Sequence, residues 1–256
     1  MNMRDPMAAT GAATQASKLS GRTVLVTGGG RGLGAAICEM LCKEGAHVFV
    51  GEFRGELAEQ CVSKLRGDGG SAEAAIMDVG DEKAVERAIR AVHDRHGRFD
   101  ILVNNAAVDI TAPIDEIPIE DFDRVLRTNL RGAIVTTKMA VPYMKKQGRG
   151  HIVNIASTAS KRAWPNASAY HTTKWGLLGF SHAMHAELRP HGIKVSAVLP
   201  GGMKTPFLLD RFPDIDPGVL QDPRNVAEAV KYVLLMPDET VIPEVMVIPM
   251  RESSWP

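Results

Sequence analysis

The stretch Thr23-Val-Leu-Val-Thr-Gly-Gly-Gly-Arg-Gly-Leu-Gly34 decides the fold of this 256-residue chain. Its first part, Thr23–Thr27, is a short apolar and β-branched run, which predicts a buried strand. Glycines follow, and residues 35–43 are spaced as in a helix. Glycine allows a sharp turn and close backbone approach, and a helix N-terminus offers free N–H groups and a positive dipole end. The stretch therefore predicts a strand, a phosphate-binding turn and a helix, rather than an ordinary glycine-rich turn.

The same alternation of apolar strands and amphipathic helices continues along the chain. Further strands are expected at His47–Val50, Ala72–Met77, from Asp100 onward, His151–Ala156 and Lys194–Leu199. Helices are expected between them, at 55–66, 81–96 and Ser168–Leu188. Continuous Val/Ile/Leu strands separated by helices are typical of a parallel sheet covered on both faces. The fold class is therefore α/β, a single doubly wound Rossmann-type domain whose six to seven strands are flanked by helices.

The composition argues against certain binding partners and bears on where in the cell the protein is expected. Lys plus Arg and Asp plus Glu number 30 each, so the net charge is zero, which argues against nucleic acid or an anionic membrane surface. No run approaches the ~20 apolar residues of a membrane span. Residues 1–18 lack the apolar centre of a signal peptide, so we expect a flexible N-terminal segment, with an organelle transit sequence as the alternative. The domain would then span 19–256, in the cytoplasm.

We expect neither a disulfide framework nor a metal site. The cysteines are Cys38, Cys42 and Cys61, an odd number with no CxxC pair. The first two would share a helix face, as half a metal site or as small packing residues. The pairs His93/His96 and His182/His185 do not resemble an HExxH motif, and we interpret them as ordinary surface histidines.

A set of residues suited to proton transfer occurs in the second half of the chain. Tyr170 and Lys174 are four apart in a predicted helix, so their side chains share one face. A free tyrosine titrates near ~10, and a neighbouring ammonium group lowers that pKa. Tyr170 could then exchange a proton with a substrate oxygen. Ser157, after the strand that ends at Ala156, could hydrogen-bond that oxygen.

Together these motifs resemble the short-chain dehydrogenase/reductase family. The shared pattern is TGxxxGxG at Thr27–Gly34, Asn-Asn-Ala at 104–106, Asn-Leu-Arg-Gly at 129–132, Ser157 before Tyr-x-x-x-Lys, and Pro-Gly-Gly-Met-Lys-Thr at 200–205. The resemblance extends from Leu19 to Arg224. Ala107 stands where the family usually has glycine, and the end of the chain, 241–256, lacks the family's glycine-rich segment.

The resemblance implies specific site residues. Ser157, Tyr170, Lys174 and Asn129 would be catalytic, with Asn129 holding a water that links Lys174 to solvent, unless it merely interrupts its helix. Tyr170 and Lys174 would also touch the cofactor. The other cofactor-binding residues would follow the strands: Gly28, Gly30, Arg31, Gly32, Leu33, Gly34, Glu52, Asp78, Val79, Asn105, Ala106, Ala107, Pro200, Gly201, Met203 and Thr205.

The cofactor is expected to be NAD, with NADP as the alternative. Glu52 follows the second strand, where a carboxylate accepts the ribose hydroxyls and repels a 2′-phosphate. Arg31 and Arg54 could instead face that phosphate.

The resulting hypothesis is an oxidoreductase that moves hydride between the nicotinamide cofactor and a secondary alcohol or ketone. An NADP-dependent carbonyl reductase, such as a 3-oxoacyl thioester reductase, or a catalytically silent cofactor-binding regulator are the alternatives. The substrate would lie between 158–165 and 207–219, and both apolar and acidic substrates suit these segments. The family also implies a homodimer or homotetramer, formed through helices near 121–146 and 169–189.

Overall fold

The computed structural model describes residues 17–252, and the predicted segment 1–18 lies almost entirely outside them. The described chain is built on one sheet of seven parallel strands in the order β3-β2-β1-β4-β5-β6-β7. The strands are β1 (Thr23–Thr27), β2 (His47–Glu52), β3 (Ser71–Ile76), β4 (Ile101–Asn104), β5 (Gly150–Ile155), β6 (Ile193–Pro200) and β7 (Glu244–Val247). This confirms the predicted α/β fold class.

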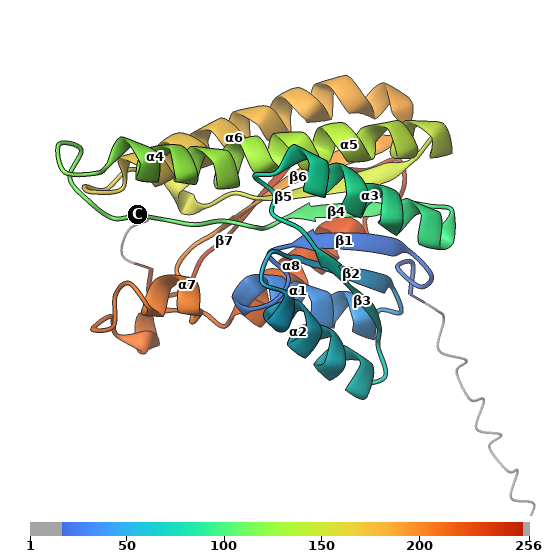
Figure 1. Cartoon of the computed structure of the whole chain (residues 1–256), viewed down its shortest axis with the longest axis horizontal. Coiled ribbons are helices and arrows are strands. Elements are labelled where there is room, and N and C mark those ends of the chain that lie inside the picture. The colour runs from blue at the N-terminus through green and yellow to red at the C-terminus, as the bar shows by residue number, and fades with distance from the viewer. Residues whose placement is uncertain (1–16, 253–256) are drawn as a thin grey trace, which may run out of the picture.

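Helices cover both faces of the sheet. They are α1 (Gly32–Lys43), α2 (Gly55–Gly67), α3 (Glu82–His96), α4 (Ile119–Leu126), α5 (Gly132–Gln147), α6 (Ser168–Leu188), α7 (Pro206–Leu209) and α8 (Pro223–Leu234). Figure 1 shows α1, α2 and α8 on one face and α3 to α6 on the other. The predicted helix at Ser168–Leu188 forms with those bounds.

The interior strand β1 contributes side chains to both halves of the core. Its side chains alternate between the two faces, as in any strand. Val24 and Val26 pack with side chains of α1, α2 and α8, whereas Leu25 packs with side chains of α3 and α5. All three are fully buried, and each such side chain stabilises the fold by about 1.5–3 kcal/mol. The glycine turn that follows β1 is thereby attached to a fully buried part of the sheet.

The order of the strands creates a crevice at one edge of the sheet. β1 pairs with β2 on one side and with β4 on the other, so the chain changes direction across the sheet after β3. In such sheets, ligands bind where the order reverses, outside the carboxyl ends of the strands. The loops that follow β1, β2, β4, β5 and β6 all lie at that edge.

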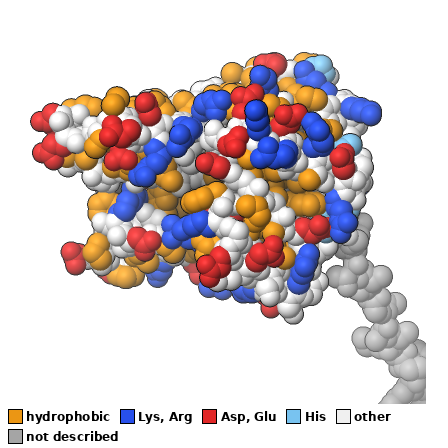
Figure 2. Space-filling model, in the orientation of Figure 1, with side chains coloured by type: hydrophobic (Ala, Val, Ile, Leu, Met, Phe, Trp, Pro, Cys, Tyr) orange, Lys and Arg blue, Asp and Glu red, His pale blue; other side chains and the backbone are white. Residues whose placement is uncertain are grey.

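The surface carries charges of both signs. Figure 2 shows basic and acidic side chains interspersed with apolar ones over the face it displays. Among residues 17–252, no helix is both long and apolar enough to cross a membrane.

Candidate active site

The glycine turn after β1 is shaped by close backbone contacts. A Cβ on Gly34 would lie 2.0 Å from the carbonyl oxygen of Gly28, so only glycine fits at this position in the first turn of α1. Gly28 itself has φ +63°, and a Cβ there would lie 2.9 Å from Cα of Ala106. Arg31 precedes the helix without a capping side-chain hydrogen bond. The first N–H groups of α1 therefore remain available for an anion.

The loop after β4 is bonded directly to that turn. The hydroxyl oxygen of Thr27 accepts hydrogen bonds from the backbone N–H groups of Asn105 and Ala106, at 3.0 and 3.1 Å. The Asn105 side-chain amide donates to the carbonyl oxygens of Thr27 and Gly28, at 3.0 and 3.1 Å. Ala107 follows in the same partly buried loop. Hydrogen bonds thus join the two loops into one wall of the crevice.

Glu52 lies beside the glycine turn at the end of β2. Its side chain is only 5% exposed, and a Cβ on Gly30 would lie 3.0 Å from its Oε2 atom. The backbone N–H of Arg54 donates to Oε1 at 3.3 Å, and the Arg54 guanidinium lies 3.6 Å away. Arg31 is paired instead with Asp210 after α7, at 3.6 Å. Both cations that sequence analysis associates with a phosphate therefore have acidic partners.

Two further predicted cofactor residues follow β3. Asp78 is exposed, and its carboxylate accepts a hydrogen bond of 2.8 Å from the N–H of Gly80. Val79 is buried against Gly132.

The remaining predicted cofactor residues follow β6. Pro200 ends that strand, and the N–H of Gly201 donates to the carbonyl of Val247 in β7 at 2.9 Å. Met203 forms a bridge with Gln221. The side chain of Thr205 lies against Gly32 of the glycine turn, since a Cβ on Gly32 would be 3.5 Å from it. This loop therefore forms the opposite wall, close to the N-terminus of α1.

Tyr170, Lys174 and Ser157 come together at the carboxyl edge of β5. Tyr170 lies in the first turn of α6, and the Lys174 ammonium lies 5.5 Å from the centre of its ring. The ammonium donates to the carbonyl of Ile155, the last residue of β5, at 2.8 Å. The Ser157 hydroxyl lies close enough to the Tyr170 hydroxyl to lower its pKa. It also accepts from the N–H of Ala159 at 3.1 Å, which fixes its position.

Burial dominates the titration of this group. It raises the pKa of Tyr170 to about 12, although the neighbouring Ser157 hydroxyl and the Arg211 cation act to lower it. It also lowers the pKa of Lys174 to about 8, against the attraction of Asp109. The net lowering of the Tyr170 pKa that sequence analysis expected from Lys174 is therefore not found, because desolvation of the phenolate is the larger effect.

Asn129 lies between the β4 loop and α6. It is buried in a π-helical turn, Arg127–Arg131, between α4 and α5. Its amide exchanges two hydrogen bonds with the backbone of Val108, at 2.8 and 2.7 Å, and donates to the Thr173 hydroxyl at 3.2 Å. Asn129 thus holds the β4 loop against the residue before Lys174. A relay through a water stays a prediction.

Sequence analysis missed an ion pair that spans the crevice. Asp109 in the β4 loop pairs with Arg211 just after α7, with 6% and 22% of their side chains exposed. The Arg211 guanidinium also lies 4.5 Å from the ring centre of Phe207, which is itself 5.9 Å from that of Tyr170. The two residues are far apart in the sequence and belong to no motif, so no local signal could have paired them.

His171 is a second site residue that sequence analysis missed. Its Nε2 accepts from the N–H of Trp164 at 3.1 Å, and its Nδ1 lies 3.0 Å from the carbonyl of Ala159. It therefore fixes the segment that follows Ser157. Its position next to Tyr170 was the only available hint.

The buried lysine predicts a specific pH dependence of stability. A pKa of about 8 lies below the ~10.4 of an unfolded lysine, so the unfolded state binds more protons between these values. Across that window, the cofactor-free protein should gain about 1.4 kcal/mol of unfolding free energy per pH unit relative to Lys174→Met. Denaturant unfolding of both proteins at pH 7 to 10 measures this, with Lys138→Met on the exposed side of α5 as control. A constant difference across the window would contradict it.

Comparison with known proteins assigns this architecture to a family. The family model of short chain dehydrogenases matches residues 22–216. The 3-oxoacyl-[acyl-carrier-protein] reductase FabG of Thermotoga maritima is 31% identical over 84% of this chain and 91% of its own length. A cyclopentanol dehydrogenase from Comamonas sp. is 33% identical over 74% and 76%, respectively.

A solved structure agrees with these relatives. The crystal structure of a metagenomic short-chain oxidoreductase in complex with NADP has a TM-score of 0.81 at 32% identity, over 91% of this chain and 99% of that one. The chain described here therefore belongs to the short-chain dehydrogenase/reductase family, whose members are nicotinamide-dependent oxidoreductases.

Proposed function

We propose that this protein is an NAD-dependent dehydrogenase that interconverts a secondary alcohol and its ketone, with Tyr170 as general acid and base. The observation that carries the proposal is that Tyr170, Ser157 and Lys174 come together after β5, at the same carboxyl edge of the sheet as the glycine turn after β1. The turn around Gly28 and Gly34 fits a pyrophosphate because its backbone leaves no room for side chains. When bound, the nicotinamide would accept the hydride from the carbinol carbon.

The residues of the chain have separate roles in this proposal. Tyr170 takes the hydroxyl proton during oxidation and returns it during reduction. Ser157 donates a hydrogen bond to the substrate oxygen and opposes its displacement. Lys174 provides the positive charge that favours the phenolate. Asn129 supports this set by holding the β4 loop against α6.

The preference for NAD rests on Glu52. A buried carboxylate beside Gly30 can accept two ribose hydroxyl groups and would repel a 2′-phosphate. Arg31 and Arg54, which could oppose this, are paired with Asp210 and Glu52.

A second candidate is an NADP-dependent reductase of 3-oxoacyl thioesters. The relative from Thermotoga maritima, named for that activity, favours it, as does the NADP in the neighbouring crystal structure. Thioester reduction would use the same tyrosine, serine and lysine.

Apolar side chains on the helices support the proposed homodimer or homotetramer. Trp175 on α6 is 54% exposed, and Ile134 on α5 is 37% exposed. A hollow of about 600 Å³ lies along α4, the π-helical turn and α5, lined by Leu126, Leu130 and charged neighbours. These are the helices through which the family resemblance implies assembly. A cytoplasmic location is part of the same proposal.

Tyr170→Phe should greatly reduce turnover and change NAD binding little, because only the hydroxyl is lost. Loss of the hydroxyl removes the proton carrier but no part of the glycine turn, so kcat should fall by about 10²–10⁴-fold. Cofactor-coupled absorbance over a panel of secondary alcohols and ketones measures the rate, and calorimetric titration measures NAD binding. Tyr232→Phe, on an exposed side chain of α8, is the control. Full activity of Tyr170→Phe would overturn the assignment.

Glu52→Ser should shift cofactor choice toward NADP. The change removes one carboxylate that repels a 2′-phosphate and accepts the ribose hydroxyls. Hydrogen bonds to charged groups contribute about 1.5–3 kcal/mol, so the NADP/NAD ratio of kcat/KM should rise by roughly tenfold or more. Glu59→Ser, on an exposed position of α2, should leave the ratio unchanged. A wild-type enzyme that already prefers NADP would favour the second candidate.

The Asp109–Arg211 pair should set the pH dependence of alcohol oxidation. The Arg211 cation lowers the pKa of Tyr170 and the Asp109 carboxylate raises it. Arg211→Gln should therefore move the rising limb of kcat/KM to higher pH, and Asp109→Asn to lower pH, each by on the order of one unit. The double variant should return toward wild type. Shifts in the same direction would show that the pair acts only through the shape of the crevice.

A further inference from the structure

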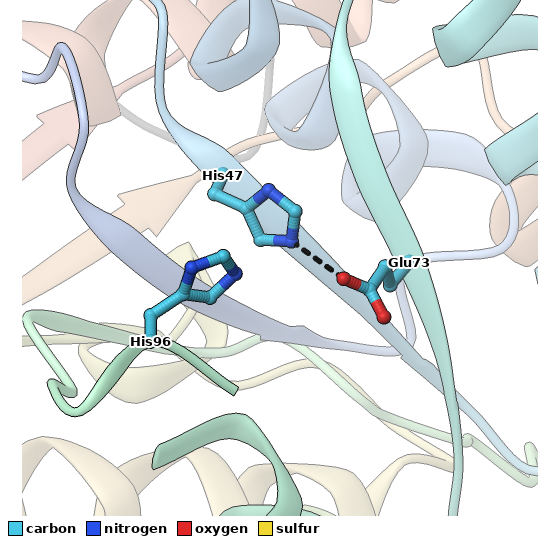
Figure 3. A group of neighbouring side chains, drawn as sticks. All are labelled: His47, Glu73 and His96. Carbon is cyan, nitrogen blue, oxygen red and sulfur yellow. Dashed lines mark hydrogen bonds and ion pairs between the residues drawn. The ribbon is translucent and has the colours of Figure 1, made fainter. Parts of the chain in front are cut away.

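Two histidines and a glutamate meet at the opposite edge of the sheet from the candidate active site. His47 is the first residue of β2, Glu73 belongs to β3 and His96 ends α3. Figure 3 shows the three side chains converging beside the strands. Glu52, at the far end of β2, is roughly 17 Å away along the strand. The cluster is therefore separate from the residues proposed to bind the cofactor.

The spacing of the donor atoms suits a single small cation. One nitrogen from each imidazole and one carboxylate oxygen all lie within 4.8 Å of one another. His47 Nε2 is 3.1 Å from Glu73 Oε1, and the two imidazole rings have centroids 4.1 Å apart. Tetrahedral zinc, with bonds of about 2.0–2.2 Å, requires neighbouring donors roughly 3.3 Å apart. The separation between His47 and Glu73 is already close to that value, and the His96 donor, within 4.8 Å of the other two, would approach by at most about 1.5 Å.

The neighbours of the cluster orient its donors as they would around a metal. The hydroxyl of Ser71 lies 2.5 Å from His47 Nδ1, which leaves Nε2 directed at Glu73. Arg95 donates from Nε to Glu73 Oε1 at 2.9 Å and holds the carboxylate in place. Hydrogen bonds that fix the other nitrogen of a histidine and the carboxylate are typical of the shell around metal ligands.

The cluster is both packed and accessible. His47 and Glu73 have 17% and 25% of their side chains exposed, and the ring of Phe49 contacts both imidazoles edge-on, with centroids 5.1 and 6.0 Å away. His96 is exposed and leaves a path for an ion. A surface hollow of about 440 Å³ between β3 and α3, lined in part by Glu73 and Arg95, gives water the same access.

We propose that His47, Glu73 and His96 bind one zinc ion, with water as the fourth ligand. Two imidazole nitrogens and one carboxylate oxygen form a donor set that zinc accepts readily. The ion would join β2, β3 and the end of α3 and so stabilise the edge of the sheet, without a part in hydride transfer. This departs from the expectation of no metal, which considered His96 only with His93. In the structure, His93 lies against Tyr143 instead, with ring centroids 4.3 Å apart.

The test is zinc titration of the full chain with saturating NAD, after removal of any affinity tag and treatment with a chelator. Wild-type protein should bind one Zn²⁺ per chain, with a rise in Tm that Mg²⁺ does not produce. Glu73→Gln and His96→Gln should each weaken binding by at least tenfold. The matched control, His93→Gln, is one turn away on the same helix and should bind as wild type does.

Cobalt identifies the ligands independently of stability. Co²⁺ bound in place of zinc should give the visible absorption of a tetrahedral nitrogen–oxygen site, and His96→Gln should lose it. Because His96 is exposed, this variant should keep its fold and activity. Failure of the wild type to bind zinc below millimolar concentration would overturn the proposal. Equal binding by the variants would also overturn it, since the ion would then be held elsewhere, for example by Cys38, Cys42 or Cys61.

Discussion

The close approach of the Gly28 carbonyl to the backbone of Gly34, which leaves no room for a Cβ, is the constraint on which the site depends. It places the N-terminus of α1 directly next to the end of β1, so the free N–H groups of the helix face the crevice. Thr27 and Asn105 then bond the β4 loop to the same turn. The loop carries Asp109, and Asn129 holds its backbone at Val108. Side chains from distant parts of the sequence are thus placed relative to one point of backbone contact.

The main energetic cost of this site is the desolvation of its charged side chains. Lys174 is 3% exposed, and its ammonium has a backbone carbonyl as its hydrogen-bond partner. Asp109 and Arg211 offset each other nearby, but the second carboxylate oxygen of Asp109 is buried and has no partner among residues 17–252. Groups with strongly shifted pKa values concentrate where proton transfer needs them. Tyr170 is desolvated and lies near opposite charges, so small changes at Asp109 or Arg211 can raise or lower its pKa.

The sequence was sufficient to predict those parts of the molecule that depend on local pattern. The strands of continuous apolar residues, the glycine turn and α6 all have periodicity or spacing that a single segment contains. The seventh strand, Glu244–Val247, is short and half-buried, and it forms only because β6 offers an unpaired edge. The Asp109–Arg211 pair, the bracing of Trp164 by His171 and the meeting of His47 with His96 depend on tertiary contacts. No window of sequence contains both members of the first or the last of these.

The π-helical turn at Arg127–Arg131 joins α4 to α5 and lets the two helices direct their side chains independently. One additional residue in a continuous α-helix would rotate everything after it by about 100°. Here the wider turn accommodates that residue, so α4 and α5 follow one another while α4 packs against α6 and α5 packs against the sheet. Asn129 lies within the widened turn, where its amide can reach the backbone of Val108. Removing a single residue from this turn would shorten the chain only slightly, yet it would change the phase of one helix relative to the other and misplace both faces together.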